Sequence, residues 1–312
     1  IVLNNMLRAV EELALPKNEM VMVSGIGCSS RISGYVDFHS LHTLHGRALA
    51  FAAGVKMSQP NLKVIVPMGD GDALAIGGNH FIHACRRNMD ITAVIMNNRI
   101  YGMTGGQFSP LTGTGFKATT APLQTIDQSF DVVQMAVASG ASYVARTTSY
   151  HFQEITKYLK QAITHKGFSV VEILSPCPVN WKMSPTDARR WVSESLEPIF
   201  PVKNFRDLDD VRGESAKLPL MEGNRLLDYL KPEKNISPEA PNETVEDQQV
   251  KIAGFGGQGV MSAGVLLSNC VIQKGLNTTW LPSYGPEMRG GTAYASVKVS
   301  TQPIGSPVVD FP

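Results

Sequence analysis

Two short polar motifs follow apolar, strand-like runs in the first half of the chain. The run Lys63–Pro67 leads into Gly69-Asp70-Gly71-Asp72, and the run Ile91–Met96 leads into Asn97-Asn98. If both runs are parallel strands, the motifs meet at the carboxyl edge of one sheet, where open α/β folds bind ligands. Carboxylate and amide oxygens suit a hard cation, and glycine lets the backbone approach a phosphate closely. Either motif alone is typical of a turn, but together they predict a metal and phosphate site.

The segments around these motifs alternate between helical and strand patterns through about residue 200. Short, wholly apolar runs separated by helices indicate a parallel sheet covered on both faces. We therefore expect a doubly wound, mostly parallel α/β domain over residues 1–200. The expected strands are Met20–Ser24, Lys63–Pro67, Ile91–Met96, Ser142–Arg146 and Ser169–Leu174, and the expected helices are Leu3–Leu15, Gly46–Met57, Ile76–Arg87, Val132–Ala138 and Phe152–Thr164.

The alternation stops after about Pro201. Residues 201–248 are expected to be an extension and linker, because the stretch Lys231–Gln249 contains prolines and glutamates and has no periodic apolar face. A partial second α/β domain is expected over residues 249–312. Its predicted elements are a strand at Gln249–Ala253, a helix at Val260–Lys274 and a strand at Ala293–Val299.

The composition excludes several classes of protein. The 312 residues include 28 Lys and Arg against 27 Asp and Glu, a balance that argues against a nucleic-acid partner. No apolar run approaches the roughly 20 residues of a membrane span, and no signal peptide opens the sequence, so we expect no membrane partner. Four widely spaced cysteines argue against a disulfide scaffold and favour a reducing cytoplasm.

Several segments, in the same order, resemble the β subunit of the 2-oxoacid:ferredoxin oxidoreductases, which use thiamine diphosphate. The resemblance covers essentially residues 1–200 and rests on Gly25-Ile26-Gly27-Cys28-Ser29, Thr43-Leu44-His45-Gly46-Arg47, Gly69-Asp70-Gly71-Asp72, the segment 98–107 and Ser175-Pro176-Cys177-Pro178. It implies that Mg²⁺ is held by Asp70, Asn98 and the carbonyl oxygen of Ile100. It also implies that the cofactor is lined by Ile26, Gly27, Cys28, Ser29, His45, Gly71, Asp72, Gly102 and Met103.

His45 lies close in sequence to His39 and His42. Their spacing fits zinc poorly, because no cysteine or carboxylate supports it. A histidine at the start of a helix, before Gly46-Arg47, can instead donate to a phosphate or lie near a reacting carbonyl. We therefore expect His45 to be catalytic, and His39 and His42 to be ordinary surface or core residues.

Two cysteines are expected to bind an iron–sulfur cluster. Cys28 follows a strand, in Gly27-Cys28-Ser29, and Cys177 follows the strand Ser169–Leu174, so both are expected at the cofactor's edge of the sheet. A [4Fe–4S] cluster needs about four thiolates, and the family supplies the other two from a Cys-x-x-Cys just upstream of the residue matching Ile1. We expect that segment to be missing here rather than the cluster to be lost. Cys85 and Cys270 are expected to be small buried residues.

A second glycine-rich loop, Gly254–Gly259, lies between the expected strand and helix of the second domain. It fits the dinucleotide pattern only in form, because no acidic residue for a ribose follows the next strand. With the segment 283–291 it resembles the start of the γ domain of the same oxidoreductases, which is associated with coenzyme A. An anion site at the helix N-terminus, with Arg289 as a second anchor, and a plain packing turn both remain open.

The resemblance implies oxidative decarboxylation of a 2-oxoacid to acyl-coenzyme A and CO₂, with electrons passing through the cluster to ferredoxin. Gly105-Gly106-Gln107 looks most like the 2-oxoglutarate members. The resemblance also implies an α subunit that carries the pyrimidine-binding domain, in a hetero-oligomer with two active halves. The small, apolar helices Gly46–Met57 and Ile76–Arg87 are consistent with a subunit interface.

Two alternatives stay open on the sequence. One is a non-oxidative thiamine diphosphate decarboxylase or synthase, in which Cys28 and Cys177 would have no role. The other is a non-catalytic dinucleotide-binding or assembly subunit that uses only the second loop. Bound thiamine diphosphate would exclude the assembly subunit, and iron–sulfur absorbance would exclude the non-oxidative enzyme.

Overall fold

The computed structural model describes residues 1–208, 246–255, 257–284 and 292–309. These residues form two compact units, one within residues 1–221 and the other within residues 222–312. In the described ranges, no helix is both long and apolar enough to cross a membrane.

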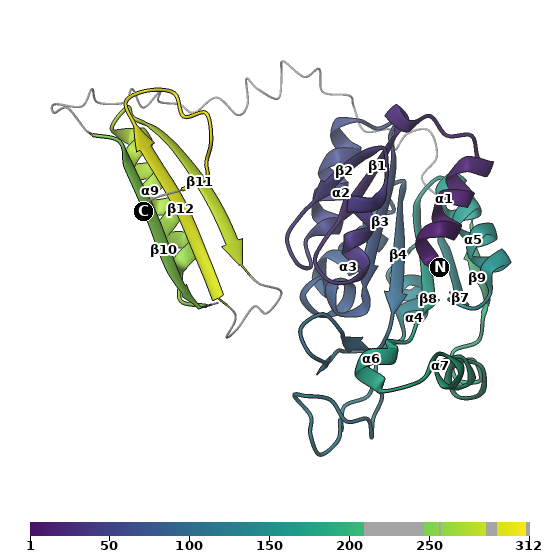
Figure 1. The fold of residues 1–312 in the computed structure, drawn as a ribbon. Helices are drawn as coiled ribbons and strands as arrows, with labels where there is room; N and C mark the ends of the chain where they lie inside the picture. Colours follow the sequence, from purple (N-terminus) through teal and green to yellow (C-terminus); the bar gives the residue numbers. More distant parts are fainter. Residues whose placement is uncertain (209–245, 256, 285–291, 310–312) are drawn as a thin grey trace. The chain divides into compact units, whose positions relative to one another are not determined.

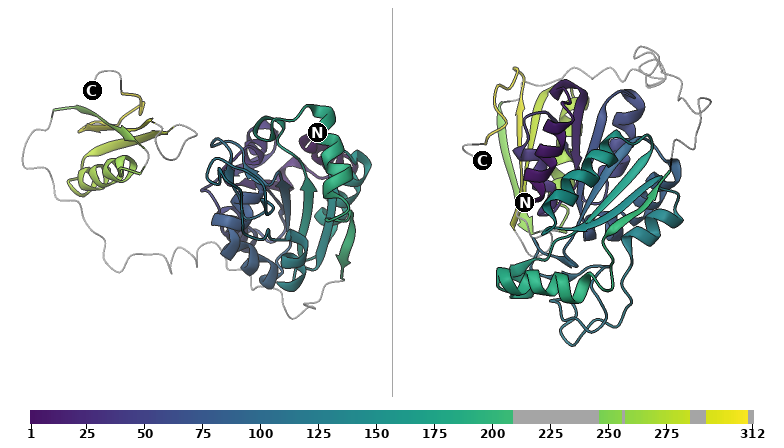
Figure 2. Two further views of the ribbon diagram at one scale, coloured as in Figure 1. Left: turned by 90° about the horizontal axis from the view of Figure 1, so that it is seen from below. Right: turned by 90° about the vertical axis from the view of Figure 1, so that its right-hand side faces the viewer.

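A seven-stranded sheet forms the centre of the first unit, with helices on both faces (Figures 1 and 2). The strand order is β2-β1-β3-β4-β8-β7-β9, and every neighbouring pair is parallel except β7 and β9. The strands are β1 (Met20–Ser24), β2 (His39–His42), β3 (Lys63–Gly69), β4 (Ile91–Asn97), β7 (Tyr143–Thr148), β8 (Phe168–Leu174) and β9 (Lys203–Asp207).

Two apolar cores, one on each face, explain why the inner strands are apolar throughout. On β1, Val21 and Val23 pack into one core, and Met20 and Met22 pack into the other. The first core takes residues from α2 (Ala48–Ser58), α3 (Gly78–Arg87) and α4 (Val132–Ala138). The second takes residues from α1 (Val2–Glu12) and α5 (Phe152–Thr164). The predicted doubly wound sheet is therefore confirmed.

Short elements connect and flank these layers. They are η1 (Lys17–Glu19), η2 (Ser29–Tyr35), η3 (Gly71–Ile76), the hairpin of β5 (Ile100–Tyr101) and β6 (Gln107–Phe108), α6 (Pro178–Trp181), α7 (Pro185–Trp191) and η4 (Val192–Leu196).

Three details differ from the prediction. The expected helix Ile76–Arg87 is split, because residues 71–76 wind as the π-helix η3 and α3 begins only at Gly78. An added Cβ at Gly77, between the two, would lie 2.3 Å from the carbonyl oxygen of Asp72, so the chain passes too closely there for a side chain. Strands β2 and β9 were not predicted. Both are polar edge strands without an apolar run, and β9 lies within the expected extension.

The described residues of the second unit form a three-stranded antiparallel sheet with one helix. Its elements are β10 (Gln248–Phe255), α9 (Val260–Gln273), β11 (Asn277–Tyr284) and β12 (Thr292–Ser300), and the strand order is β10-β12-β11. The predicted strand, helix and final strand are present, whereas β11 was not predicted. Of the expected linker Lys231–Gln249, residues 231–245 lie outside the described residues.

Candidate functional site

The two polar motifs lie side by side at the carboxyl edge of the first sheet. Asp70 directly follows β3 and Asn98 directly follows β4, and these strands are neighbours. The backbone N–H of Asn98 donates to Asp70 Oδ1 at 3.4 Å. The convergence of Asp70 and Asn98 that the sequence predicted is therefore present.

Asp70 is a buried carboxylate in a polar surrounding. Its side chain is 1% exposed, and its Oδ2 accepts a hydrogen bond from the hydroxyl of Ser109. Burial raises the pKa of Asp70 to about 6, although Ser109 and the Asn98 N–H oppose this shift. A divalent cation would offset the cost of an ionised carboxylate here. Nearby, Asn98 Oδ1 accepts a hydrogen bond from the N–H of Ile100 at 3.0 Å. The donor set fits a hard cation such as Mg²⁺.

Asp72 holds the loop before α2 in place. Its Oδ1 accepts hydrogen bonds from His45 Nδ1 at 2.5 Å, from the Gly46 N–H at 2.6 Å and from the Ile26 N–H at 3.4 Å. An added Cβ at Gly25 would lie 2.3 Å from Asp72 Oδ2, so only glycine fits against this carboxylate. With Nδ1 bound to Asp72, His45 has Nε2 as its other ring nitrogen for a ligand. Sequence reasoning placed His45 and Asp72 in the site but missed that one orients the other.

Replacing Asp72 with alanine is expected to lower the free energy of unfolding of the chain by about 2 kcal/mol, because three donors lose their buried acceptor. Urea denaturation of the two proteins measures this difference. Asp37→Ala is the matched control, because Asp37 is fully exposed and pairs only with the surface residue Lys17. Equal stability of Asp72→Ala and the control would show that the three contacts have no energetic role.

Tyr101 closes one side of the site. Its hydroxyl donates to the carbonyl oxygen of Gly71 at 3.2 Å, and its ring meets the ring of His45 edge to face. Burial raises the pKa of Tyr101 to about 12, so it is a neutral donor at physiological pH. An added Cβ at Gly71 would lie 2.3 Å from the Tyr101 ring. Tyr101 was not predicted as a site residue, although it lies within the motif that follows Asn98.

Several buried polar atoms on the segments around this edge lack a hydrogen-bond partner within the described residues. They include Ser29 Oγ, Ser30 Oγ, Asp72 Oδ2 and Arg99 Nε. Ser29 Oγ lies 3.3 Å from the position of an added Cβ at Gly69, so it faces the end of β3. Buried polar atoms are almost always paired. Unpaired ones beside glycines at a sheet's carboxyl edge fit a bound polar ligand such as a diphosphate cofactor.

Cys28 and Cys177 approach one another beside this edge. Partial burial raises the pKa of Cys28, and the nearby thiol of Cys177 raises it further. The side-chain amide of Asn180 donates to Cys177 Sγ at 3.3 Å and to the carbonyl oxygen of Gly102 at 3.1 Å, which joins the cysteine to the loop after Asn98. The described ranges contain no group of three or more His, Cys, Asp or Glu side chains arranged for a metal.

The other two cysteines behave differently from each other. Cys85 is buried in α3 as predicted, and burial raises the pKa of its thiol to about 12. The prediction for Cys270 was wrong, because Cys270 is exposed. Helix α9 covers a single sheet and buries only the face that carries Val260, Gly264, Ser268 and Val271. Cys270 lies outside that buried face.

The described part of the second glycine-rich loop packs against itself. The N–H of Phe255 donates to Gln258 Oε1 at 2.9 Å, and an added Cβ at Gly254 would lie 2.6 Å from that same oxygen. These contacts favour a packing turn over an open anion site. Gly256 and Arg289, the expected second anchor, lie outside the described residues.

Two families match separate parts of the chain. Residues 25–173 match the C-terminal TPP-binding domain of thiamine pyrophosphate enzymes. Residues 249–312 match the pyruvate ferredoxin/flavodoxin oxidoreductase family.

Individual relatives agree with these matches. The chain is 51% identical over 211 residues to 2-oxoglutarate synthase subunit KorB of Archaeoglobus fulgidus, covering 68% of the chain and 75% of the relative. It is 34% identical to ketoisovalerate oxidoreductase subunit VorA of Methanothermobacter thermautotrophicus, covering 97% of the chain and 66% of that relative. A solved 2-oxoglutarate:ferredoxin oxidoreductase from Magnetococcus marinus, with 2-oxoglutarate, coenzyme A and succinyl-CoA bound, superimposes with a TM-score of 0.63 at 30% identity, covering 74% of this chain and 89% of that one.

Proposed function

This chain belongs to the 2-oxoacid:ferredoxin oxidoreductase family, and on that premise we propose that it is the subunit that binds thiamine diphosphate during oxidative decarboxylation of 2-oxoglutarate. The names of its relatives support this substrate. The observation that carries the proposal is the carboxyl-edge site, where a buried carboxylate, an adjacent Asn and several unpaired polar atoms gather. The family's other substrates and products are coenzyme A, acyl-coenzyme A and CO₂.

The residues divide into two roles in this proposal. Mg²⁺ would be held by Asp70, Asn98 and the carbonyl oxygen of Ile100, beside the diphosphate. The cofactor would be lined by Ile26, Gly27, Cys28, Ser29, His45, Gly71, Asp72, Gly102 and Met103. When bound, thiamine diphosphate supplies the carbon nucleophile that makes decarboxylation of a 2-oxoacid possible.

The protein's own contribution is orientation and proton control. Asp72 fixes the ring of His45 through Nδ1, which directs Nε2 to the ligand as a donor to a phosphate or a reacting oxygen. Tyr101 holds the backbone at Gly71, where the chain must lie close to the diphosphate. His45 is therefore the proposed catalytic residue, and Asp72 also positions it.

Electron transfer is assigned to a [4Fe–4S] cluster beside the cofactor. Cys28 and Cys177 would supply two of its thiolates, and their proximity supports this role. The remaining thiolates would come from residues other than Cys85, because Cys85 is buried in a helix. Ferredoxin would accept the electrons. The free cysteines support a reducing cytoplasm as the location.

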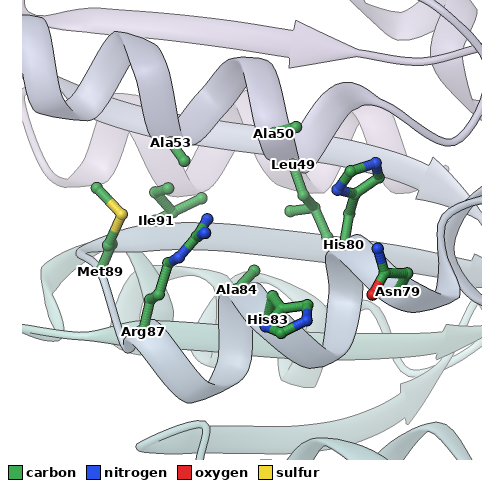
Figure 3. A pocket seen from close by; sticks show the side chains of 10 residues that line it. All are labelled: Leu49, Ala50, Ala53, Asn79, His80, His83, Ala84, Arg87, Met89 and Ile91. Atoms are coloured by element: carbon green, nitrogen blue, oxygen red, sulfur yellow. The ribbon is translucent and has the colours of Figure 1, made fainter.

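An exposed apolar face on α2 and α3 supports assembly with other subunits. Phe51 and Met57 on α2 are 43% and 56% exposed, and Ile82 on α3 is 42% exposed. Between the two helices lies a pocket that is lined by small and apolar side chains and also by His80 and Arg87 (Figure 3). We propose that this apolar face contacts another subunit in a hetero-oligomer with two active halves. In this assembly an α subunit would carry the pyrimidine-binding domain.

Substrate turnover by the purified enzyme tests the proposal. Anaerobic assays with coenzyme A and oxidised ferredoxin would compare 2-oxoglutarate, pyruvate and 2-oxoisovalerate, with CO₂ release and ferredoxin reduction as readouts. We expect kcat/KM to be highest for 2-oxoglutarate and turnover to vanish when thiamine diphosphate is removed. A higher kcat/KM for another 2-oxoacid would overturn the substrate, and turnover of none of them would overturn the function.

A further inference from the structure

A chain of buried polar side chains crosses the first sheet beneath the proposed metal site. Arg146 on β7 donates through Nε to Glu172 Oε2 on β8 at 2.6 Å and through a terminal nitrogen to Asp131 Oδ1 at 2.6 Å. Glu172 Oε1 in turn accepts from Asn97 Nδ2, at the end of β4, at 2.7 Å. The side chains of Arg146 and Glu172 are each only 1% exposed. An Arg–Glu pair is thus enclosed in a sheet whose other buried residues are uncharged.

Strand register places these groups on one face. Arg146 stands opposite Glu172, and Glu172 stands opposite Ile95, two positions before Asn97. Strands β4, β8 and β7 are consecutive neighbours in the sheet. Because side chains two positions apart point to the same face of a strand, Glu172 bridges the sheet from Arg146 to the last residue of β4.

From Asn97 the contacts continue into the loop that carries the proposed metal ligands. Asn97 Oδ1 accepts from the N–H of Arg99 at 3.0 Å. Arg99 adopts a left-handed backbone conformation with φ of 62°, which is unfavourable for a side chain of this size. Its carbonyl oxygen accepts from the hydroxyl of Thr112 at 2.5 Å. The backbone of Arg99, directly after Asn98, is therefore held in a strained form by the side chains of Asn97 and Thr112.

A second contact links the two arginines. The guanidinium carbons of Arg99 and Arg146 each lie 5.1 Å from the ring centroid of Phe200. Arg99 is also stacked at 5.7 Å from the ring centroid of Phe116. Both ends of the Arg99 residue, its backbone and its side chain, are thus connected to the Arg146–Glu172 pair.

A buried ion pair seldom stabilises a fold more than apolar residues of the same shape would, so another role is expected for this one. We propose that Glu172 is a positioning residue that holds Asn97, and through it the backbone of residues 98–100, in the conformation that binds the divalent cation. This role rests on the proposed metal site at Asp70, Asn98 and Ile100. It goes beyond that site, because Glu172 and Arg146 touch neither cation nor cofactor.

Divalent-cation affinity of the purified enzyme tests this role. Mn²⁺, in the presence of thiamine diphosphate, would be titrated and its free concentration followed by electron paramagnetic resonance. In Glu172→Gln the single amide oxygen cannot serve both Arg146 and Asn97, so Asn97 loses its acceptor. Asn97→Ala breaks the same link but leaves the Arg146–Glu172 pair intact. Both variants are expected to bind Mn²⁺ about 10- to 100-fold more weakly, the usual effect of removing an outer partner of a metal ligand.

The matched control is Lys56→Met. Lys56 pairs with Asp90 at 2.9 Å, just before the opposite end of β4, and its side chain is 7% exposed. This variant removes a buried charge, its ion pair with the partly exposed Asp90 and its hydrogen bond to the carbonyl oxygen of Leu62, and it is expected to keep wild-type Mn²⁺ affinity even where its melting temperature falls. If Glu172 had only a structural role, all three variants would bind Mn²⁺ with similar affinity.

The outcomes separate this proposal from the one it rests on. Unchanged Mn²⁺ affinity in both Glu172→Gln and Asn97→Ala overturns the positioning role, provided that Asp70→Ala abolishes binding. Retention of Mn²⁺ by Asp70→Ala overturns the metal site itself and the positioning role with it. Should Glu172→Gln fail to fold, Asn97→Ala alone decides, because its ion pair is intact.

Discussion

Asp70→Ala is expected to abolish retention of thiamine diphosphate and Mg²⁺ in the purified enzyme while the fold survives. Asp70 is the only charged side chain among the proposed metal ligands, and it is 1% exposed. Without the charge of Asp70, the cation would lose its anionic ligand, and the diphosphate beside the cation would lose its anchor. Removing an outer partner of a metal ligand already weakens metal binding by about 10- to 100-fold. Removing the ligand itself should therefore weaken metal binding by at least about 100-fold. Cofactor fluorescence after oxidation and elemental analysis measure both contents.

Two further variants calibrate this result. Asn98→Ala removes a neutral amide at the same position of the site, so we expect a smaller loss of the same kind. Asp90→Ala removes a carboxylate just before the other end of β4 and should leave the enzyme fully loaded. Circular dichroism checks that each variant is folded. Stoichiometric thiamine diphosphate and Mg²⁺ in folded Asp70→Ala would show that the metal assignment is wrong.

Cys28→Ser and Cys177→Ser are each expected to remove most of the iron and acid-labile sulfide from the full-length protein. A [4Fe–4S] cluster needs about four thiolates, and the thiol of Cys177 lies near enough to raise the pKa of Cys28. Iron analysis, sulfide analysis and the visible absorbance band of the cluster give the readouts. The expected change is from a full cluster to almost none.

Cys85→Ser is the matched control for this pair. Cys85 is a free cysteine of the same unit, but it is buried in α3, so its replacement should leave the iron content unchanged. Unchanged iron in both Cys28→Ser and Cys177→Ser would refute the cluster assignment. So would a full-length protein without iron, and either result would favour the non-oxidative thiamine diphosphate enzyme.

The inner sheet could be predicted from sequence because its strands are buried on both faces. Strand β1 matches its predicted bounds Met20–Ser24, and all five of its residues are buried. The edge strands could not be predicted in this way. All four residues of β2 are exposed, and β9 is polar and partly exposed, so neither has an apolar run to mark it.

The nearness of Asp70 and Asn98 was predictable because both follow neighbouring parallel strands. The bond between His45 and Asp72 was not, since it joins the turn before α2 to the π-helix η3, 27 positions apart, without any periodic pattern. The Arg146–Glu172 pair left a signal that was missed. Each is a charged residue within a strand whose other residues are uncharged, Tyr143–Thr148 and Phe168–Leu174, and such residues are almost never buried unless they are paired.

Anaerobic addition of 2-oxoglutarate to the enzyme loaded with thiamine diphosphate, without ferredoxin, tests most directly whether this chain serves an oxidative decarboxylase. The absorbance and the electron paramagnetic resonance of the cluster would be followed together with CO₂. We predict that CO₂ release is accompanied by bleaching of the cluster band and by the signal of a reduced cluster, and that both depend on an intact Asp70. Release of CO₂ from a protein whose cluster signals do not change would contradict electron transfer and identify a non-oxidative thiamine diphosphate enzyme.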